Sequence, residues 1–147
     1  MANMCENYLR ISGPADDVGR FKERAMGYSP WHMPVSGEAP EPLNFHSLLP
    51  IPDEVLAAGY HAAGYEWEYE HWGCKWGACG SRIVDDWDEG LLYEFDSAWS
   101  PPLQFIEQVS RQWPTLVFVL EYEESGDGYK GLAKAEAGTL EDHCINL

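Results

Sequence analysis

The sequence predicts an α+β domain of the ferredoxin-like class, a split βαβ unit whose antiparallel sheet carries two helices on one face. The prediction depends first on the order of its strand-like and helix-like segments, which is βα, ββ, α, ββ. It depends also on length, because 147 residues is a common size for one domain. Internal repeats, heptads and low-complexity tracts are absent from the sequence. We therefore expect residues 1–147 to form a single domain.

The first strand and the first helix are expected at the N-terminal end. Residues 7–12 alternate polar and apolar side chains, as a half-buried strand does, and stop at Gly13-Pro14. Pro14 followed closely by two aspartates is typical of the opening turn of a helix. Apolar residues then recur at helical spacing as far as Ala25.

A long insertion is expected after the first helix. Residues 26–42 contain six glycines and prolines, which regular helices and strands do not tolerate, so a surface loop is predicted there. A short helix is predicted over residues 53–58. The stretch 60–80 has no clean period but is rich in tyrosine and tryptophan. We interpret residues 26–80 as a loop-rich aromatic insertion within the domain.

The second half of the unit begins with a hairpin. Residues 81–87 and 91–96 are β-prone runs joined by Asp88-Glu89-Gly90. Ser100, followed by two prolines, is predicted to cap a second helix that ends near Trp113. Two further strands are predicted, the second of them an extra C-terminal strand, over residues 116–123 and 129–137.

The composition indicates a folded and strongly acidic protein. The hydrophobic fraction is 45% and the aromatic fraction 14%, which excludes a disordered chain. Nine lysines and arginines oppose 25 acids, giving a net charge of −16. Such a charge makes nucleic acid and anionic membranes poor direct partners and favours a protein with a basic surface. Acidic surfaces are also common in soluble proteins, so charge alone does not identify a partner.

The expected location is the cytoplasm. The sequence lacks any run approaching the roughly 20 apolar residues of a membrane span, and its start lacks the features of a signal peptide. Without a secretory signal, reduced cysteines are the better expectation. We therefore predict free thiols at Cys5, Cys74, Cys79 and Cys144.

Four short motifs are spread over nearly the whole chain. They are NMCEN (3–7), HWGCKWGA (71–78), FDSAWSPP (95–102) and LEYEESGDGYKG (120–131). In combination they resemble the YubB-type family of plasmid and phage proteins. The resemblance implies a ferredoxin-like domain and an association with mobile genetic elements, but no established activity. The chain departs from the usual pattern of that family at Met4, His71, Cys74 and Gly77.

Enzymatic and metal sites find little support in the sequence. The spacing of Cys74 and Cys79 near His71 matches no standard zinc pair. A thiol nucleophile would need a histidine and an orienting group beside it, and the sequence places none there. The glycines near residue 126 lack the GK[ST] ending of a phosphate-binding loop. We expect no metal and no cofactor, and the sequence favours a non-enzymatic protein.

An aromatic cluster gives the first candidate contact site: Trp72, Lys75, Trp76, Asp96 and Trp99. A lysine between two tryptophans can lie against an indole ring and pair with Asp96 or a glutamate. Two interpretations stay open. The cluster either locks the insertion onto the sheet, or forms a protein-contact patch or small-ligand pocket.

Acids gather in the middle of the chain and give the second candidate site. Residues 51–100 contain eleven acids and two bases. If Asp85, Asp86 and Asp88 share a face with the glutamates at 66, 68 and 70, that face is a continuous anionic patch whose carboxylates can stand in for phosphates.

Together these features predict a protein-binding module that acts through an acidic, tryptophan-containing face. In its narrower form the hypothesis is a nucleic-acid mimic that blocks a host defence or DNA-processing factor. The alternative is an enzyme or small-ligand binder centred on Trp72, Lys75, Trp76 and Trp99. Whether the protein forms homo-oligomers stays open.

Overall fold

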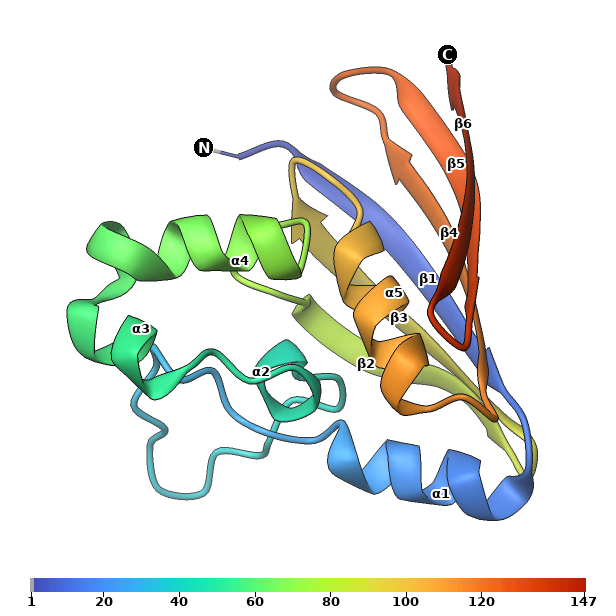
Figure 1. The fold of residues 1–147 in the computed structure, drawn as a ribbon, viewed down its shortest axis with the longest axis horizontal. Coiled ribbons are helices and arrows are strands. Elements are labelled where there is room, and N and C mark those ends of the chain that lie inside the picture. The colour runs from blue at the N-terminus through green and yellow to red at the C-terminus, as the bar shows by residue number, and fades with distance from the viewer. Residues whose placement is uncertain (1) are drawn as a thin grey trace.

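Six antiparallel strands build one sheet, and the helices lie against one of its faces (Figure 1). The computed structural model describes residues 2–147. Its strands are β1 (Met4–Ser12), β2 (Cys79–Trp87), β3 (Gly90–Ala98), β4 (Val117–Glu124), β5 (Tyr129–Glu136) and β6 (Thr139–Asn146). Its helices are α1 (Ala15–Arg24), α2 (Phe45–Leu48), α3 (Asp53–Ala58), the π-helical turn η1 (Tyr60–Gly64), α4 (Tyr65–His71) and α5 (Leu103–Gln112).

The strand order confirms the predicted fold class. Neighbouring strands follow the order β2-β3-β1-β4-β5-β6, and every pair is antiparallel. With α1 after β1 and α5 after β3, the first four strands form the ferredoxin-like βαββαβ unit. Strands β5 and β6 extend the sheet beyond β4.

Strand β6 is absent from the sequence-based expectation, which contains one extra C-terminal strand instead of two. Its ladder with β5 runs from the pair Tyr129–Asn146 to the pair Glu136–Thr139. The sequence of β6, TLEDHCIN, shows no apolar alternation, because nearly all of this edge strand is exposed and no face of it has to fill the core.

The insertion contains more regular structure than its sequence predicts. The predicted helix Asp53–Ala58 is confirmed, and an isolated bridge between Gly27 and Glu41 closes the loop 26–42. Residues 60–71 also form the turn η1 and helix α4. A π-helical turn holds more residues than an α-helical turn, so the aromatic spacing departs from the period that predicts helices.

Ser100 does not cap α5, which corrects the sequence-based expectation. The helix begins at Leu103, and its N-cap residue Pro102 forms no side-chain cap hydrogen bond. The Ser100 hydroxyl instead donates a hydrogen bond of 2.6 Å to the carbonyl oxygen of Gly73. It thereby ties the loop before α5 to the loop after α4.

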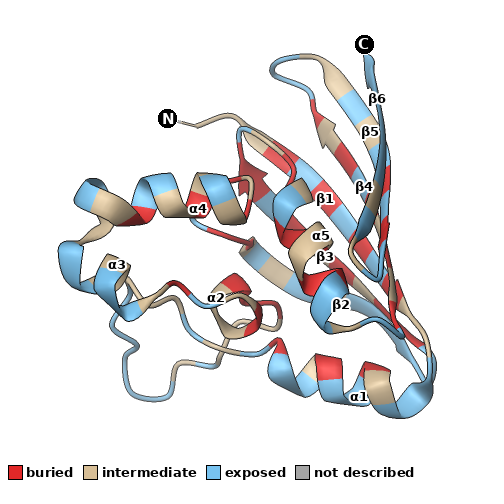
Figure 2. Cartoon of the chain, viewed as in Figure 1, coloured by how far each residue is buried: buried red, intermediate tan, exposed pale blue. Residues whose placement is uncertain are grey.

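The core lies between the sheet and the helices. Buried and exposed residues alternate along β1, as Figure 2 shows. Phe45 of α2 stacks on Phe105 of α5 with 3.7 Å between ring centroids, and meets Phe95 and Trp72 edge-on. The insertion therefore contributes to the same core as the sheet. None of the helices in residues 2–147 is long and apolar enough to cross a membrane.

Candidate functional site

Trp72 belongs to the core, which corrects its interpretation as a contact residue. Its side chain is only 3% exposed, and its indole Nε1–H donates a hydrogen bond of 3.1 Å to the carbonyl oxygen of Leu49. A tryptophan buried in this way contributes packing area and offers no surface to a partner.

Trp76 and Trp99, by contrast, are 50% and 39% exposed and hold unusual backbone angles. Their φ values are 72° and 69°, in the left-handed region that bulky residues rarely adopt. The hydrogen bond between Ser100 and Gly73 ties together the two loops that carry them. Such strain persists only where surrounding contacts enforce it, and it is often found at functional sites.

Lys75 lies against the indole ring of Trp76, as the sequence suggests. Its ammonium nitrogen is 4.3 Å from the centroid of that ring and 5.9 Å from the centroid of the Tyr65 ring. The expected ion pair is absent: within residues 2–147, Lys75 pairs with neither Asp96 nor a glutamate. Asp96 is exposed on β3, opposite Glu6 of β1.

A buried carboxylate, which the sequence analysis assigned to the exposed anionic patch, holds this region together. Glu68 of α4 is fully buried, and its two oxygens accept hydrogen bonds from the Trp31 indole Nε1–H at 2.9 Å and the Trp76 backbone N–H at 2.7 Å. Burial raises the pKa of Glu68, and these hydrogen bonds only partly offset that effect. The contacts favour the interpretation that this cluster locks the insertion in place.

The acids of α4 do not form the anionic patch considered from the sequence. Glu66 and Glu70 are exposed, whereas Glu68 between them is buried. Successive side chains of a helix point in different directions, so an every-second-residue series cannot share one face. The only signal for Glu68 in the sequence is a glutamate between Trp67 and Tyr69.

The three aspartates of the β2–β3 hairpin are also separated from one another. Asp85 lies opposite Leu92 in the ladder, Asp86 forms an ion pair with Lys22 of α1, and Asp88 lies in the turn. Successive side chains of a strand alternate between faces, which explains why Asp85 and Asp86 diverge.

The same ladder separates the aspartates from the aromatic cluster. Asp96 pairs with Cys79 at the start of β2, whereas Asp86 pairs with Leu91 near the hairpin turn. The acidic and aromatic groups predicted from the sequence therefore lie toward opposite ends of the hairpin and do not form one site.

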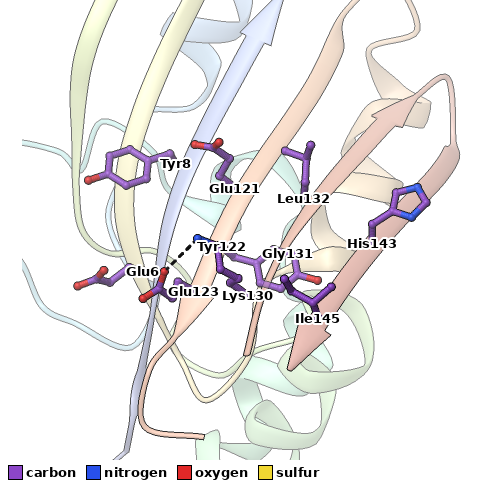
Figure 3. A pocket seen from close by; sticks show the side chains of 10 residues that line it. All are labelled: Glu6, Tyr8, Glu121, Tyr122, Glu123, Lys130, Gly131, Leu132, His143 and Ile145. Carbon is purple, nitrogen blue, oxygen red and sulfur yellow. Dashed lines mark ion pairs between the residues drawn. The ribbon is translucent and has the colours of Figure 1, made fainter. Parts of the chain in front are cut away.

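The sheet face that carries no helix, here called the open face, brings other acids together. Asp96, Glu6 and Glu123 lie side by side in register on β3, β1 and β4, and we call them the carboxylate row. All three are at least partly exposed. Lys130 of β5 pairs with Glu123 at 3.7 Å, and this is the ion pair drawn in Figure 3.

A groove of about 390 Å³ crosses the open face over β1, β4, β5 and β6. Figure 3 shows its side chains in two rows, with Tyr8, Glu121, Leu132 and His143 above Glu6, Glu123, Lys130 and Ile145. A second hollow of about 200 Å³ shares Tyr8, Glu121 and Leu132 with it and continues toward Leu92 of β3. The two hollows together present acids beside exposed apolar side chains.

Comparison with known proteins identifies the family of the chain. A family model described as the ferredoxin-like domain in Api92-like protein matches residues 71–146. The chain belongs to this family. The match begins at the end of α4 and spans β2 to β6 with α5, so it includes Glu121, Leu132 and His143 of the groove. Strand β1 and most of the insertion lie outside it.

A solved Api92 structure shows the same fold over its whole length. The crystal structure of a protein Api92 from Yersinia pseudotuberculosis matches with a TM-score of 0.74 and 10% identity, covering 100% of this chain and 98% of that one. At that identity the likeness concerns the fold alone. A search of curated proteins finds no match. The comparisons name the Api92-like family, and the resemblance to the YubB-type family, with its mobile-element association, stays a prediction.

The thiols of this Api92-like chain are poorly suited to nucleophilic chemistry. All four cysteines are free, and Cys5 and Cys74 are buried. Burial raises the pKa of Cys5 to about 12 and that of Cys74 well above its ordinary value. Both therefore stay protonated at neutral pH, whereas the reactive form of cysteine is the thiolate. Within residues 2–147, no three histidine, cysteine or acidic side chains are grouped to hold a metal ion.

Proposed function

We propose that this Api92-like chain is a non-enzymatic protein-binding module that recognises a partner with a basic surface through the open face of its sheet. The observation that carries the proposal is the carboxylate row, in which Glu6 lies between Asp96 and Glu123 in cross-strand register. Like charges placed directly opposite one another destabilise a sheet. Because Lys130 already pairs with Glu123, a cationic partner would mainly relieve the repulsion between Glu6 and Asp96 and gain affinity from it.

The net charge supports the same kind of partner. A net charge of −16 creates a field that attracts basic surfaces and accelerates their encounter. The open face also carries an exposed tryptophan, Trp87. The guanidinium carbon of Arg10 lies 5.3 Å from the centroid of the Trp87 ring. The proposed face is acidic and carries a tryptophan, as in the sequence-based hypothesis, but its tryptophan is Trp87 and not Trp72, Trp76 or Trp99.

A narrower proposal is that the face mimics nucleic acid and occupies the basic groove of a host defence or DNA-processing factor. Carboxylates exposed in a row are the feature that supports it. A partner captured on the carboxylate row should then be released by added DNA. The resemblance of the motifs to the YubB-type family supports a further proposal, that the gene is carried by a mobile genetic element. Plasmid or phage genes on either side of it would support this proposal.

Capture from a bacterial lysate tests the main proposal. We expect the wild-type protein to retain a basic protein at low salt and to lose it at high salt, because salt screens exposed charges. The double variant Glu6→Gln/Glu123→Gln should retain much less of it. The matched control Glu66→Gln/Glu70→Gln removes two exposed charges from α4 and should retain it. Equal retention by both variants would contradict the proposal.

The left-handed backbone of Trp76 and Trp99 favours a second candidate, a small-ligand or catalytic site at that end of the sheet. The space available is small. The hollow beside Trp31, Glu68, Trp72 and Trp76 measures about 20 Å³, which is room for about one water molecule. Quenching of tryptophan fluorescence by a small-molecule library would support this candidate, provided that Trp76→Ala abolishes it.

A further inference from the structure

We infer that the groove on the open face takes an arginine side chain from a partner segment in which arginines alternate with aliphatic or aromatic residues. This inference rests on the proposed function and names the partner chemistry. It makes the ring of Tyr8 the surface on which the guanidinium lies, between the carboxylates of Glu6 and Glu121.

Glutamates in the walls of the groove supply negative charge, and the lysine that also lines it, Lys130, pairs with Glu123. Glu6 precedes Tyr8 by two residues on β1 and lies on the same face, and Glu121 lies opposite Tyr8 on β4. Within the described chain, no lysine or arginine lies within 4.0 Å of either carboxylate. Two carboxylates beside one ring suit a guanidinium, which donates several hydrogen bonds in its plane while its face lies on an aromatic ring.

The floor of the groove is apolar, which excludes a purely basic segment as its best occupant. Tyr8 is 42% exposed, Leu132 48% and Ile145 60%, and all three line the same hollow. Leu132 lies directly opposite Glu121 in the ladder, so an apolar position adjoins an acidic one across the strands. A partner gains most from covering both kinds of surface, with an aliphatic or aromatic residue beside each cation.

The open face already binds one arginine in this way. Within the chain itself, the Arg10 guanidinium lies over the Trp87 ring at 5.3 Å. Arg10 and Tyr8 are two residues apart on β1 and therefore lie on the same face. The geometry required of a partner arginine is thus one that this surface already accommodates.

Charge excludes the other classes of occupant. A second copy of the chain would bring its own carboxylate row against this one, and nucleic acid or an anionic membrane would meet the same repulsion. A basic peptide segment is the occupant that the acids, the exposed ring and the apolar floor favour together.

Fluorescence anisotropy with short labelled peptides tests the inference. The probe alternates arginine and leucine, and two comparison peptides carry lysine for arginine or serine for leucine. A guanidinium can stack on the Tyr8 ring and donate two parallel hydrogen bonds to a carboxylate, so we expect the lysine peptide to bind about fivefold more weakly. The serine peptide loses the apolar contacts and should bind about tenfold more weakly. Equal affinity for all three peptides would overturn the inference.

Variants locate the binding site. Glu121→Gln and Tyr8→Thr should each weaken binding of the arginine–leucine peptide about tenfold, as loss of an anchor does. Glu66→Gln on α4 is the control, with less than about a twofold effect. Glu121→Gln keeps the size of the side chain, and circular dichroism confirms that each variant is folded. Unchanged affinity in both groove variants would refute the site.

The two proposals fail in different ways. If lysate capture depends on Glu6 and Glu123 while Tyr8→Thr and Glu121→Gln bind the peptide like the wild type, the acidic face is functional and only the arginine groove is wrong. If the Glu6→Gln/Glu123→Gln variant captures as much of the partner as the wild type does, the proposed function itself is wrong.

Discussion

The carboxylate of Glu68 accepts a hydrogen bond of 2.9 Å from the indole of Trp31, which lies 37 residues earlier in the chain. The other carboxylate oxygen accepts the backbone N–H of Trp76. One buried side chain therefore fixes both the loop 26–42 and the left-handed residue before β2. Stability and the position of an exposed tryptophan depend on the same contact.

Glu68→Ala should destabilise the fold strongly. The substitution leaves two partly buried N–H donors without an acceptor and opens a cavity, for which we expect a loss of about 2–4 kcal/mol in the free energy of unfolding. Urea denaturation followed by tryptophan fluorescence measures it. Glu66→Ala, an exposed position on the same helix, is the control and should change stability by less than about 0.5 kcal/mol. Equal effects would show that Glu68 is not an anchor.

The raised pKa of Glu68 makes stability depend on pH in a defined direction. The folded protein holds this proton more tightly than the unfolded chain does, so the contribution of Glu68 is fully present below its ordinary pKa of 4.5 and is lost as pH rises through the raised value. In Glu68→Gln that titration is absent. The unfolding free energy of the wild type, relative to Glu68→Gln, should therefore fall as pH rises above about 4.5. A pH-independent difference in urea denaturation would contradict this.

Ala137, in the turn between β5 and β6, can be replaced to make the protein more stable. Ala137 has φ of 50° and Gly138 φ of 85°, the pattern of a two-residue hairpin turn that favours Asn-Gly. Ala137→Asn should raise the free energy of unfolding by about 0.5–1 kcal/mol, because asparagine tolerates the left-handed region better than alanine. Ala137→Val should lower it. Thermal unfolding ranks the three proteins, and the order Val above Ala would contradict the turn geometry.

The four thiols should differ sharply in reactivity. Cys144 is exposed on β6, whereas Cys5 and Cys74 are buried and their raised pKa keeps them protonated. Iodoacetamide at neutral pH should modify Cys144 first, Cys79 slowly, and Cys5 and Cys74 only after unfolding. Mass spectrometry of the intact protein and its peptides follows the order. Early modification of Cys5 would show that its environment is open.

Local patterns in the sequence predict most of the fold. Leu9 and Ile11 alternate with polar neighbours and predict β1, and Asp88-Glu89-Gly90 predicts the hairpin of β2 and β3, because these signals lie within a few residues. The same rules fail for β6, whose exposed residues have no core to fill, and for η1, whose turn departs from the helical period.

The candidate binding surfaces are harder to predict because they depend on contacts between distant segments. Glu6, Asp96 and Glu123 become neighbours only through the register of β1 with β3 and β4, which the sequence does not display. The aromatic motif around Trp72 is visible in the sequence. Only the folded structure shows that Trp72 is buried whereas Trp76 is exposed. The sequence identifies the residue types, and the topology decides which of them share a face.

The single variant Glu6→Gln tests most directly whether the carboxylate row is kept for binding and not for stability. Removing the central charge of the row relieves repulsion from Asp96 and Glu123, so the free energy of unfolding should rise by about 0.3–1 kcal/mol. The same variant should bind the arginine–leucine peptide more weakly than the wild type. A variant that is less stable than the wild type and binds the peptide equally well would contradict the account.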